Sequence, residues 1–174
     1  MSGEVKITKN ALYFALLSMG EKDSLLLKYL APEDVQDVSK YVKARDEWME
    51  KELAELDFDG KVYPSAPFMR LLYVVTHKRA VSIWRESGCM NFWINGEPEI
   101  LKIHIAGEQA HLQLQPKRSF YTDLKGEIYQ KKSGFLETKR VLDGKTLKEK
   151  VGKTTAMETL GNHVQLMYEE VAND

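Results

Sequence analysis

Apolar residues in the first sixty positions recur at spacings of three and four, which is the period of one face of an α-helix. The first run ends at Gly20, the second covers residues 25–30, and the third begins after Pro32 and continues to the vicinity of Gly60. Glycine commonly follows a helix, and proline suits the first turn of one. We therefore predict a helical region over residues 1–60.

Proline interrupts this pattern between residues 61 and 67, so that segment is a candidate joint. Apolar positions from residue 68 onward return to helical spacing, and we predict a helix that ends at Gly88. An alternative stays open there, because Leu71–Val75 alone also suits a buried strand. Residues 68–174 are predicted to form an α+β region that makes one compact unit with the helical region.

From Met90 onward the apolar and polar positions alternate, which is the period of a strand with one buried face. Asn95-Gly96 is a strong hairpin signal because both residues tolerate positive φ, and Asp143-Gly144 marks a second hairpin. Further strands are predicted at Ser119–Leu124, Glu127–Gln130, Phe135–Leu142 and residues 145–151. With a C-terminal helix over Asn162–Val171, the predicted fold class is α+β, with an antiparallel sheet of about five strands.

The segment from residue 101 to residue 114 also predicts its own strand register. A two-residue turn at Gly107-Glu108 places three apolar pairs on one face of the sheet: Ile105 with Ala110, Ile103 with Leu112, and Leu101 with Leu114. The opposite face then pairs His104 with His111.

Composition narrows the class of protein. The 174 residues are 43% hydrophobic and 29% charged, values typical of a folded domain. No apolar run approaches the roughly 18 residues of a membrane span, and residues 1–9 lack the basic start and apolar stretch of a signal peptide. The single cysteine, Cys89, forms no internal disulfide and is expected to be a small buried side chain. We therefore expect a cytoplasmic protein.

Charge is unevenly distributed, although the net charge is only −1. Residues 1–60 carry 8 basic and 13 acidic side chains, whereas residues 117–153 carry 11 and 5. The two stretches either steer a partner of opposite charge or attract each other inside the fold. Aromatic residues lie among the basic ones in the second stretch, as in surfaces that stack bases. Ordinary strands with outward lysines have the same composition, so we expect no nucleic-acid partner.

Candidate chemistry is sparse. His104 and His111 are weak candidates for metal ligands, because a metal normally takes three or more protein ligands and only Glu108 lies near them in sequence. Two Gly-Lys-Thr tripeptides, at 144–146 and 152–154, are similar to the end of a phosphate-binding loop but lack its earlier glycine. We therefore predict no catalytic residue and no cofactor.

The N-terminal helices resemble a known family. Residues 18–21, 27–30 and 31–36 read Ser-Met-Gly-Glu, Leu-Lys-Tyr-Leu and Ala-Pro-Glu-Asp-Val-Gln. Over residues 8–42 this pattern resembles the repeated helical motif of the flagellar motor-switch protein FliG, although that family stays helical where this chain turns to sheet. Helices of that family pack against neighbouring subunits or partner proteins, so the resemblance implies an interaction module.

A second resemblance covers Phe92–Gln115. A hairpin, the sequence Gly-Glu-Pro-Glu and two alternating strands are similar to the opening of a sterol-carrier-type lipid-binding domain. This resemblance implies that one sheet face lines a tunnel for an acyl chain, the face of Leu101, Ile103, Leu112 and Leu114. The alternative is that the protein's own helices fill that face.

The function that these patterns predict is a non-catalytic protein-interaction or regulatory module, which binds a protein partner or associates with itself. The candidate interaction face consists of Leu12, Leu16, Leu26 and Leu30. The alternatives are a carrier of an apolar, lipid-like small molecule and a metal-dependent enzyme that uses His104 and His111.

Overall fold

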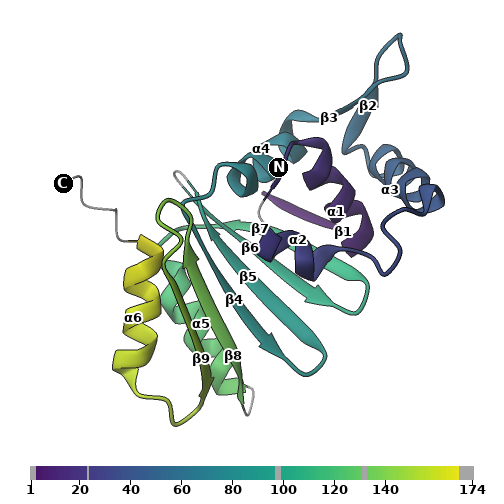
Figure 1. The fold of residues 1–174 in the computed structure, drawn as a ribbon. Helices are drawn as coiled ribbons and strands as arrows, with labels where there is room; N and C mark the ends of the chain where they lie inside the picture. Colours follow the sequence, from purple (N-terminus) through teal and green to yellow (C-terminus); the bar gives the residue numbers. More distant parts are fainter. Residues whose placement is uncertain (1–2, 23, 97–98, 131–132, 169–174) are drawn as a thin grey trace.

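The structure is a computed structural model of the chain, and it describes residues 3–22, 24–96, 99–130 and 133–168 (Figure 1). Within these residues the elements follow in this order: β1 (Glu4–Thr8), α1 (Lys9–Ser18), α2 (Ser24–Leu30), α3 (Val38–Glu50), β2 (Ala54–Leu56), β3 (Val62–Pro64), α4 (Ala66–Thr76), β4 (Ala80–Glu86), β5 (Cys89–Asn95), β6 (Ile100–Ala106), β7 (Gln109–Gln115), α5 (Ser119–Gln130), β8 (Ser133–Arg140), β9 (Thr146–Gly152) and α6 (Met157–Tyr168). No helix among the described residues is long and apolar enough to cross a bilayer.

The strands of the described chain form one antiparallel sheet of seven strands, in the order β1-β7-β6-β5-β4-β8-β9, and a separate two-stranded hairpin, β2–β3. The predicted mixture of helices, antiparallel sheet and C-terminal helix is confirmed. The expected number of about five strands is too low, because β1, β2 and β3 lie in the region predicted to be wholly helical or a joint, and β4 was predicted as helix.

Helices cover both faces of the large sheet (Figure 1). Side chains of α1 to α4 share one core with one face of the strands, and side chains of α5 and α6 share a second core with the other face. β4 serves both cores, because Ile83 points into the first and Trp84 into the second. Such a strand is apolar on both sides and lacks the alternation of a strand with one wet face.

This double burial explains one wrong prediction. The helix expected to run to Gly88 ends at Thr76 as α4, and β4 begins at Ala80. Within β4 the apolar residues Ala80, Ile83 and Trp84 happen to fall at spacings of three and one, which also suits a helix face.

A second correction concerns Ser119–Leu124 and Glu127–Gln130, which were predicted as strands and form the single helix α5. Phe120, Leu124 and Ile128 lie four residues apart and are buried in the second core. Gly126 lies within this helix, and a side chain at its position would have no neighbour within 4 Å, so it lies on the open side of the helix. Periodicity therefore decides the structure against the β-propensity of the aromatic residues.

The third helix is shorter than predicted. α3 ends at Glu50, and Glu52 adopts a φ of 58°, in the left-handed region that normally ends a helix. The main-chain N–H of Leu53 then donates to the carbonyl of Trp48 at 2.8 Å, which closes the helix end. The chain leaves α3 into β2 and returns through β3, so the candidate joint at residues 61–67 contains a strand and the start of α4.

The predicted register of the β6–β7 hairpin is confirmed. Ile105 pairs with Ala110, Ile103 with Leu112, Leu101 with Leu114, and His104 with His111. β5 pairs with β6 after the predicted Asn95-Gly96 signal, and β8 pairs with β9 around Asp143-Gly144. Of these four signal residues only Gly144 adopts positive φ, at 71°, so the expected positive φ at Asn95 and Gly96 is wrong.

Candidate functional site

The four leucines predicted to form an interaction face lie in the core. Leu12, Leu16, Leu26 and Leu30 are each 0% exposed and pack in the cluster between the first four helices and the sheet. Their helical spacing marks the inward face of α1 and α2. Any surface of this region that binds a partner must therefore consist of other residues.

The predicted ligand-binding face of the sheet is also filled. Leu101, Ile103 and Leu112 are fully buried, and Leu114 is partly buried, in the same cluster as side chains of α1 and α4. This face belongs to a packed core and does not line a tunnel, which is the alternative that the sequence left open.

His104 and His111 lie side by side, as the register predicted. His104 forms a hydrogen bond through Nδ1 with Oδ1 of Asn91 at 2.8 Å, and His111 contacts the carboxylate of Glu4 through Nε2. Among the described residues, no group of three or more histidine, cysteine, aspartate or glutamate side chains is arranged to hold a metal ion.

A buried polar chain joins α6 to the sheet. The Oγ atoms of Ser82 and Thr138 lie 2.7 Å apart, Thr138 Oγ1 lies 2.7 Å from His163 Nδ1, and His163 Nε2 lies 2.7 Å from Glu149 Oε2. A hydroxyl, an imidazole and a carboxylate in line are typical of nucleophilic catalysis. Ser82, Thr138 and His163 are, however, 0% exposed, so a substrate has no access to the hydroxyls. This series of hydrogen bonds therefore acts as a structural link between α6 and the sheet.

A groove of about 330 Å³ lies between α1, α3, the start of α4 and the β2–β3 hairpin. We call it the hairpin groove. Its lining includes Ala15 and Ser18 from α1, Tyr41, Arg45 and Trp48 from α3, Phe68 from α4, and Ala54 and residues 60–64 from the hairpin. Aromatic side chains make up much of this lining, with Arg45 and Lys61 as its cations.

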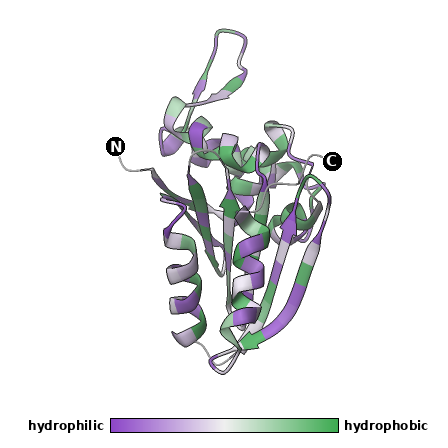
Figure 2. Cartoon of the chain, turned by 90° about the vertical axis from the view of Figure 1, so that its left-hand side faces the viewer, coloured by the Kyte–Doolittle hydropathy of each residue, from purple (hydrophilic) through white to green (hydrophobic). Residues whose placement is uncertain are grey.

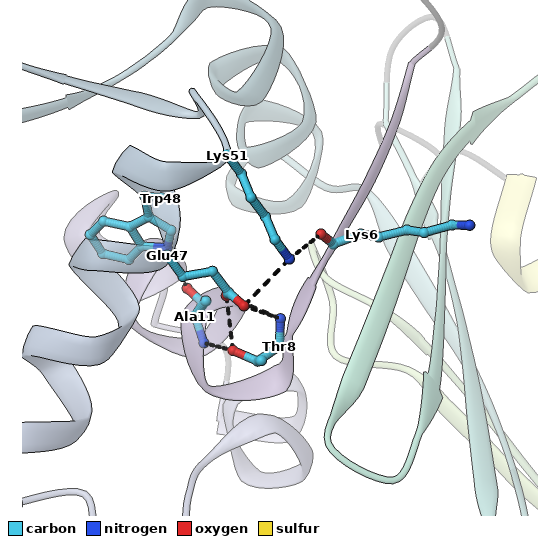
Figure 3. A network of polar contacts seen from close by, with 6 residues as sticks. All are labelled: Lys6, Thr8, Ala11, Glu47, Trp48 and Lys51. Carbon is cyan, nitrogen blue, oxygen red and sulfur yellow. Dashed lines mark hydrogen bonds and ion pairs between the residues drawn. The ribbon is translucent and has the colours of Figure 1, made fainter.

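Polar contacts connect α3, which lines one side of the groove, to β1 and α1 (Figure 3). The Glu47 carboxylate accepts hydrogen bonds from the main-chain N–H of Thr8 at 3.1 Å and from its hydroxyl at 2.9 Å. Lys51 Nζ donates to the carbonyl oxygen of Lys6 at 2.9 Å. Glu47 and Lys51 thus provide hydrogen-bond partners for main-chain groups of β1 on the side that faces away from β7. α3 therefore also protects this edge strand of the sheet. Hydrogen bonds to charged groups each contribute about 1.5–3 kcal/mol.

Trp48 fixes the wall of the groove. Its Nε1 donates to the carbonyl oxygen of Ala11 at 3.0 Å, and its ring packs edge-on against Tyr41 with centroids 6.3 Å apart. Tyr41 in turn packs edge-on against Phe14, with centroids 5.6 Å apart. The aromatic wall is therefore rigid before any ligand arrives, which lowers the entropic cost of binding.

The hairpin extends away from the rest of the molecule (Figures 1 and 2). Asp57 builds its turn, because Oδ1 accepts from the main-chain N–H groups of Asp59 at 2.9 Å and Lys61 at 2.8 Å. Gly60 takes a φ of 79°, which a glycine adopts without strain. This turn presents Phe58 at its tip, where the side chain is fully exposed.

Other large apolar side chains on the elements around the groove are exposed as well. They are Leu17 on α1, Val38, Tyr41 and Val42 on α3, and Leu56 and Tyr63 on the hairpin. Single exposed apolar residues are ordinary, but a concentration around a groove marks a binding surface.

Sequence reasoning missed this surface because it assigned residues 53–59 to a helix. One signal was present: Phe58 lies between Asp57 and Asp59-Gly60, a turn sequence in which an apolar residue cannot be buried by its own hairpin.

No family model matches the chain, and a comparison with curated proteins finds no match.

Proposed function

We propose that this chain is a non-catalytic protein-interaction module that binds its partner at the hairpin groove. The observation that carries the proposal is the rigid aromatic groove next to a projecting hairpin with a fully exposed phenylalanine. Buried aromatic anchors in preformed pockets dominate the energy of protein interfaces.

The distribution of exposed apolar residues favours a protein over a small molecule. A volume of about 330 Å³ lies at the lower end of the range for small-molecule sites. A small ligand in the groove would leave Phe58 and Val38 in water, because neither lines it. A protein surface is large enough to cover the groove and the hairpin together.

Charge argues against a lipid surface as the partner. The hairpin carries Glu55, Asp57 and Asp59 beside Phe58, and anionic lipid headgroups repel acidic side chains. Membrane-binding tips normally combine their apolar residues with lysine and arginine.

Site-specific photo-crosslinking in the cells that make the protein tests this proposal. A photoreactive phenylalanine analogue replaces Tyr63, which is 51% exposed in the groove, or Tyr129, which is 55% exposed on α5. The two positions are matched in exposure but lie on opposite faces of the large sheet. We expect discrete protein adducts from position 63, and we expect that the same adducts do not form from position 129.

The pattern of adducts decides the outcome. Adducts at position 63 that vanish when Tyr41, which lines the groove and is 40% exposed, is replaced by serine support the groove as the binding site. Identical adducts at both positions, or none at position 63, would contradict the proposal.

A further inference from the structure

We infer that the partner at the hairpin groove is a second copy of this chain, which inserts its Phe58 into the groove and receives the first copy's Phe58 in its own. The inference rests on the proposed function and names the partner. It follows from three features: the position of the tip, the lining of the groove and the distribution of charge.

Tip and groove belong to the same part of the surface. The groove is lined by residues 60–64, and Phe58 lies only two residues before that segment. A two-fold interface requires one patch that contains both complementary parts, because each copy must give and receive the same contact. The hairpin groove and the tip beside it meet this requirement.

The groove lining suits a phenylalanine ring. Tyr41 and Tyr63 offer aromatic surface at 40% and 51% exposure, while Trp48 and Phe68 line the groove but are nearly buried. Aromatic rings prefer offset or edge-on contacts with one another. Phe58 is an anchor with few rotatable bonds, on a turn that Asp57 holds in place. Little conformational entropy is lost when such an anchor is buried.

The charges of the tip and of the groove are complementary. Glu55 and Asp59 are exposed beside Phe58, and Arg45 and Lys61 line the groove. The ion pair of Arg45 with Asp46 is long, at 3.9 Å, and both side chains are well exposed. When Phe58 of one copy enters the groove of the other, its neighbour Asp59 comes close to the other copy's Arg45.

Sedimentation equilibrium of the full purified chain tests the inference through the tip. We expect a reversible dimer whose dissociation constant rises about tenfold or more in Phe58→Ser. Leu142→Ser is the matched control, because Leu142 is 79% exposed in the turn between β8 and β9 and should leave the constant unchanged. At concentrations below the dissociation constant, unfolding curves of both variants should match that of the parent chain, since neither side chain is buried within the single chain.

Charge reversal tests the contact itself. Arg45→Glu and Asp59→Lys should each weaken the dimer, because each places like charges together. Mixing the two variants in equal amounts should restore dimers, since every contact in the mixed pair then joins opposite charges. Restoration by mixing is a result that a merely structural role of either residue would not produce.

Three results overturn the inference. These are a monomer at every concentration, a dimer that Phe58→Ser leaves unchanged, and a mixture that dimerises no better than its components. If the chain is monomeric while position 63 still crosslinks a different protein, the second copy is excluded and the interaction module stands. If neither association nor adducts occur, both proposals fall.

Discussion

The indole N–H of Trp48 donates a hydrogen bond to the main-chain carbonyl of Ala11 at 3.0 Å, across 37 positions of the chain. The bond connects α3 to α1 beneath the hairpin groove. Trp48 is thus a fixed wall of the groove and, at 4% exposure, also a part of the core.

Replacing Trp48 by phenylalanine should lower the free energy of unfolding by about 1–3 kcal/mol, because the hydrogen bond and part of the packing are lost. Urea denaturation measures the change. Tyr41→Phe, which alters an exposed side chain of the same wall, should stay within about 0.5 kcal/mol of the parent chain. Equal effects of the two substitutions would show that the Ala11 contact contributes nothing.

Glu52 is the one non-glycine residue with positive φ in the described chain. A left-handed conformation costs an L-residue about 1–2 kcal/mol, whereas glycine adopts it readily. Glu52→Gly should therefore keep or raise the free energy of unfolding, by up to about 1 kcal/mol. Lys43→Gly, in the exposed interior of α3, should lower it by a similar amount. Thermal unfolding of both variants measures whether the two changes in stability have opposite signs. A clear loss of stability in Glu52→Gly would show that the left-handed conformation of Glu52 carries no strain.

A buried ion pair holds the segment after α1 against the end of α4. Lys78 Nζ lies 2.9 Å from Glu21 Oε1, both side chains are 4% exposed, and Nζ also donates to the carbonyl of Val75 at 3.1 Å. Lys78→Met should cost about 3–5 kcal/mol, since it removes a cation that lies 2.9 Å from a buried carboxylate. Adding Glu21→Met should recover part of the loss. A double variant as unstable as the sum of the two singles would rule out the coupling.

His163 should make stability depend on pH. Burial lowers the pKa of His163 below the ordinary 6.5, against the opposing effect of the hydrogen bond that its ring donates to the Glu149 carboxylate. The unfolded chain therefore binds the proton more readily than the folded chain between the lowered pKa and 6.5. The contribution of neutral His163 to stability is complete above pH 6.5 and declines as the pH falls through that interval.

Urea denaturation on both sides of pH 6.5 measures this slope, and His163→Gln supplies the control without the titrating group. The parent chain should lose more stability on acidification than the variant does. The same slope in both proteins would assign the pH dependence to other groups.

Parts of this fold follow from sequence because local rules determine them. The register of β6 and β7 follows from a two-residue turn and a period of two, which together leave one pairing with all apolar residues on one face. The start of α1 follows from Thr8, whose hydroxyl accepts from the main-chain N–H of Ala11 at 3.1 Å.

Other parts depend on long-range contacts that no local pattern records. Ile83 and Trp84 read as helix because β4 is buried on both faces, and only the pairing with β5 and β8 makes it a strand. Glu47 and Lys51 read as an ordinary helix surface, yet they satisfy the edge of β1 some 40 residues earlier. The groove likewise brings together residues of α1, α3, α4 and the β2–β3 hairpin, which lie far apart in sequence, so local patterns do not predict its lining.

We expect the hairpin groove and its tip to be covered by protein in the cell. Hydroxyl-radical footprinting inside cells, compared with the dilute purified chain, measures this coverage at Phe58 and Tyr63, with Tyr129 and Phe135 as exposed references. The account predicts that oxidation of Phe58 and Tyr63 falls in the cell while that of the two references stays the same. If each of the four side chains is oxidised to the same extent in the cell as in the purified chain, coverage of the groove and tip is contradicted.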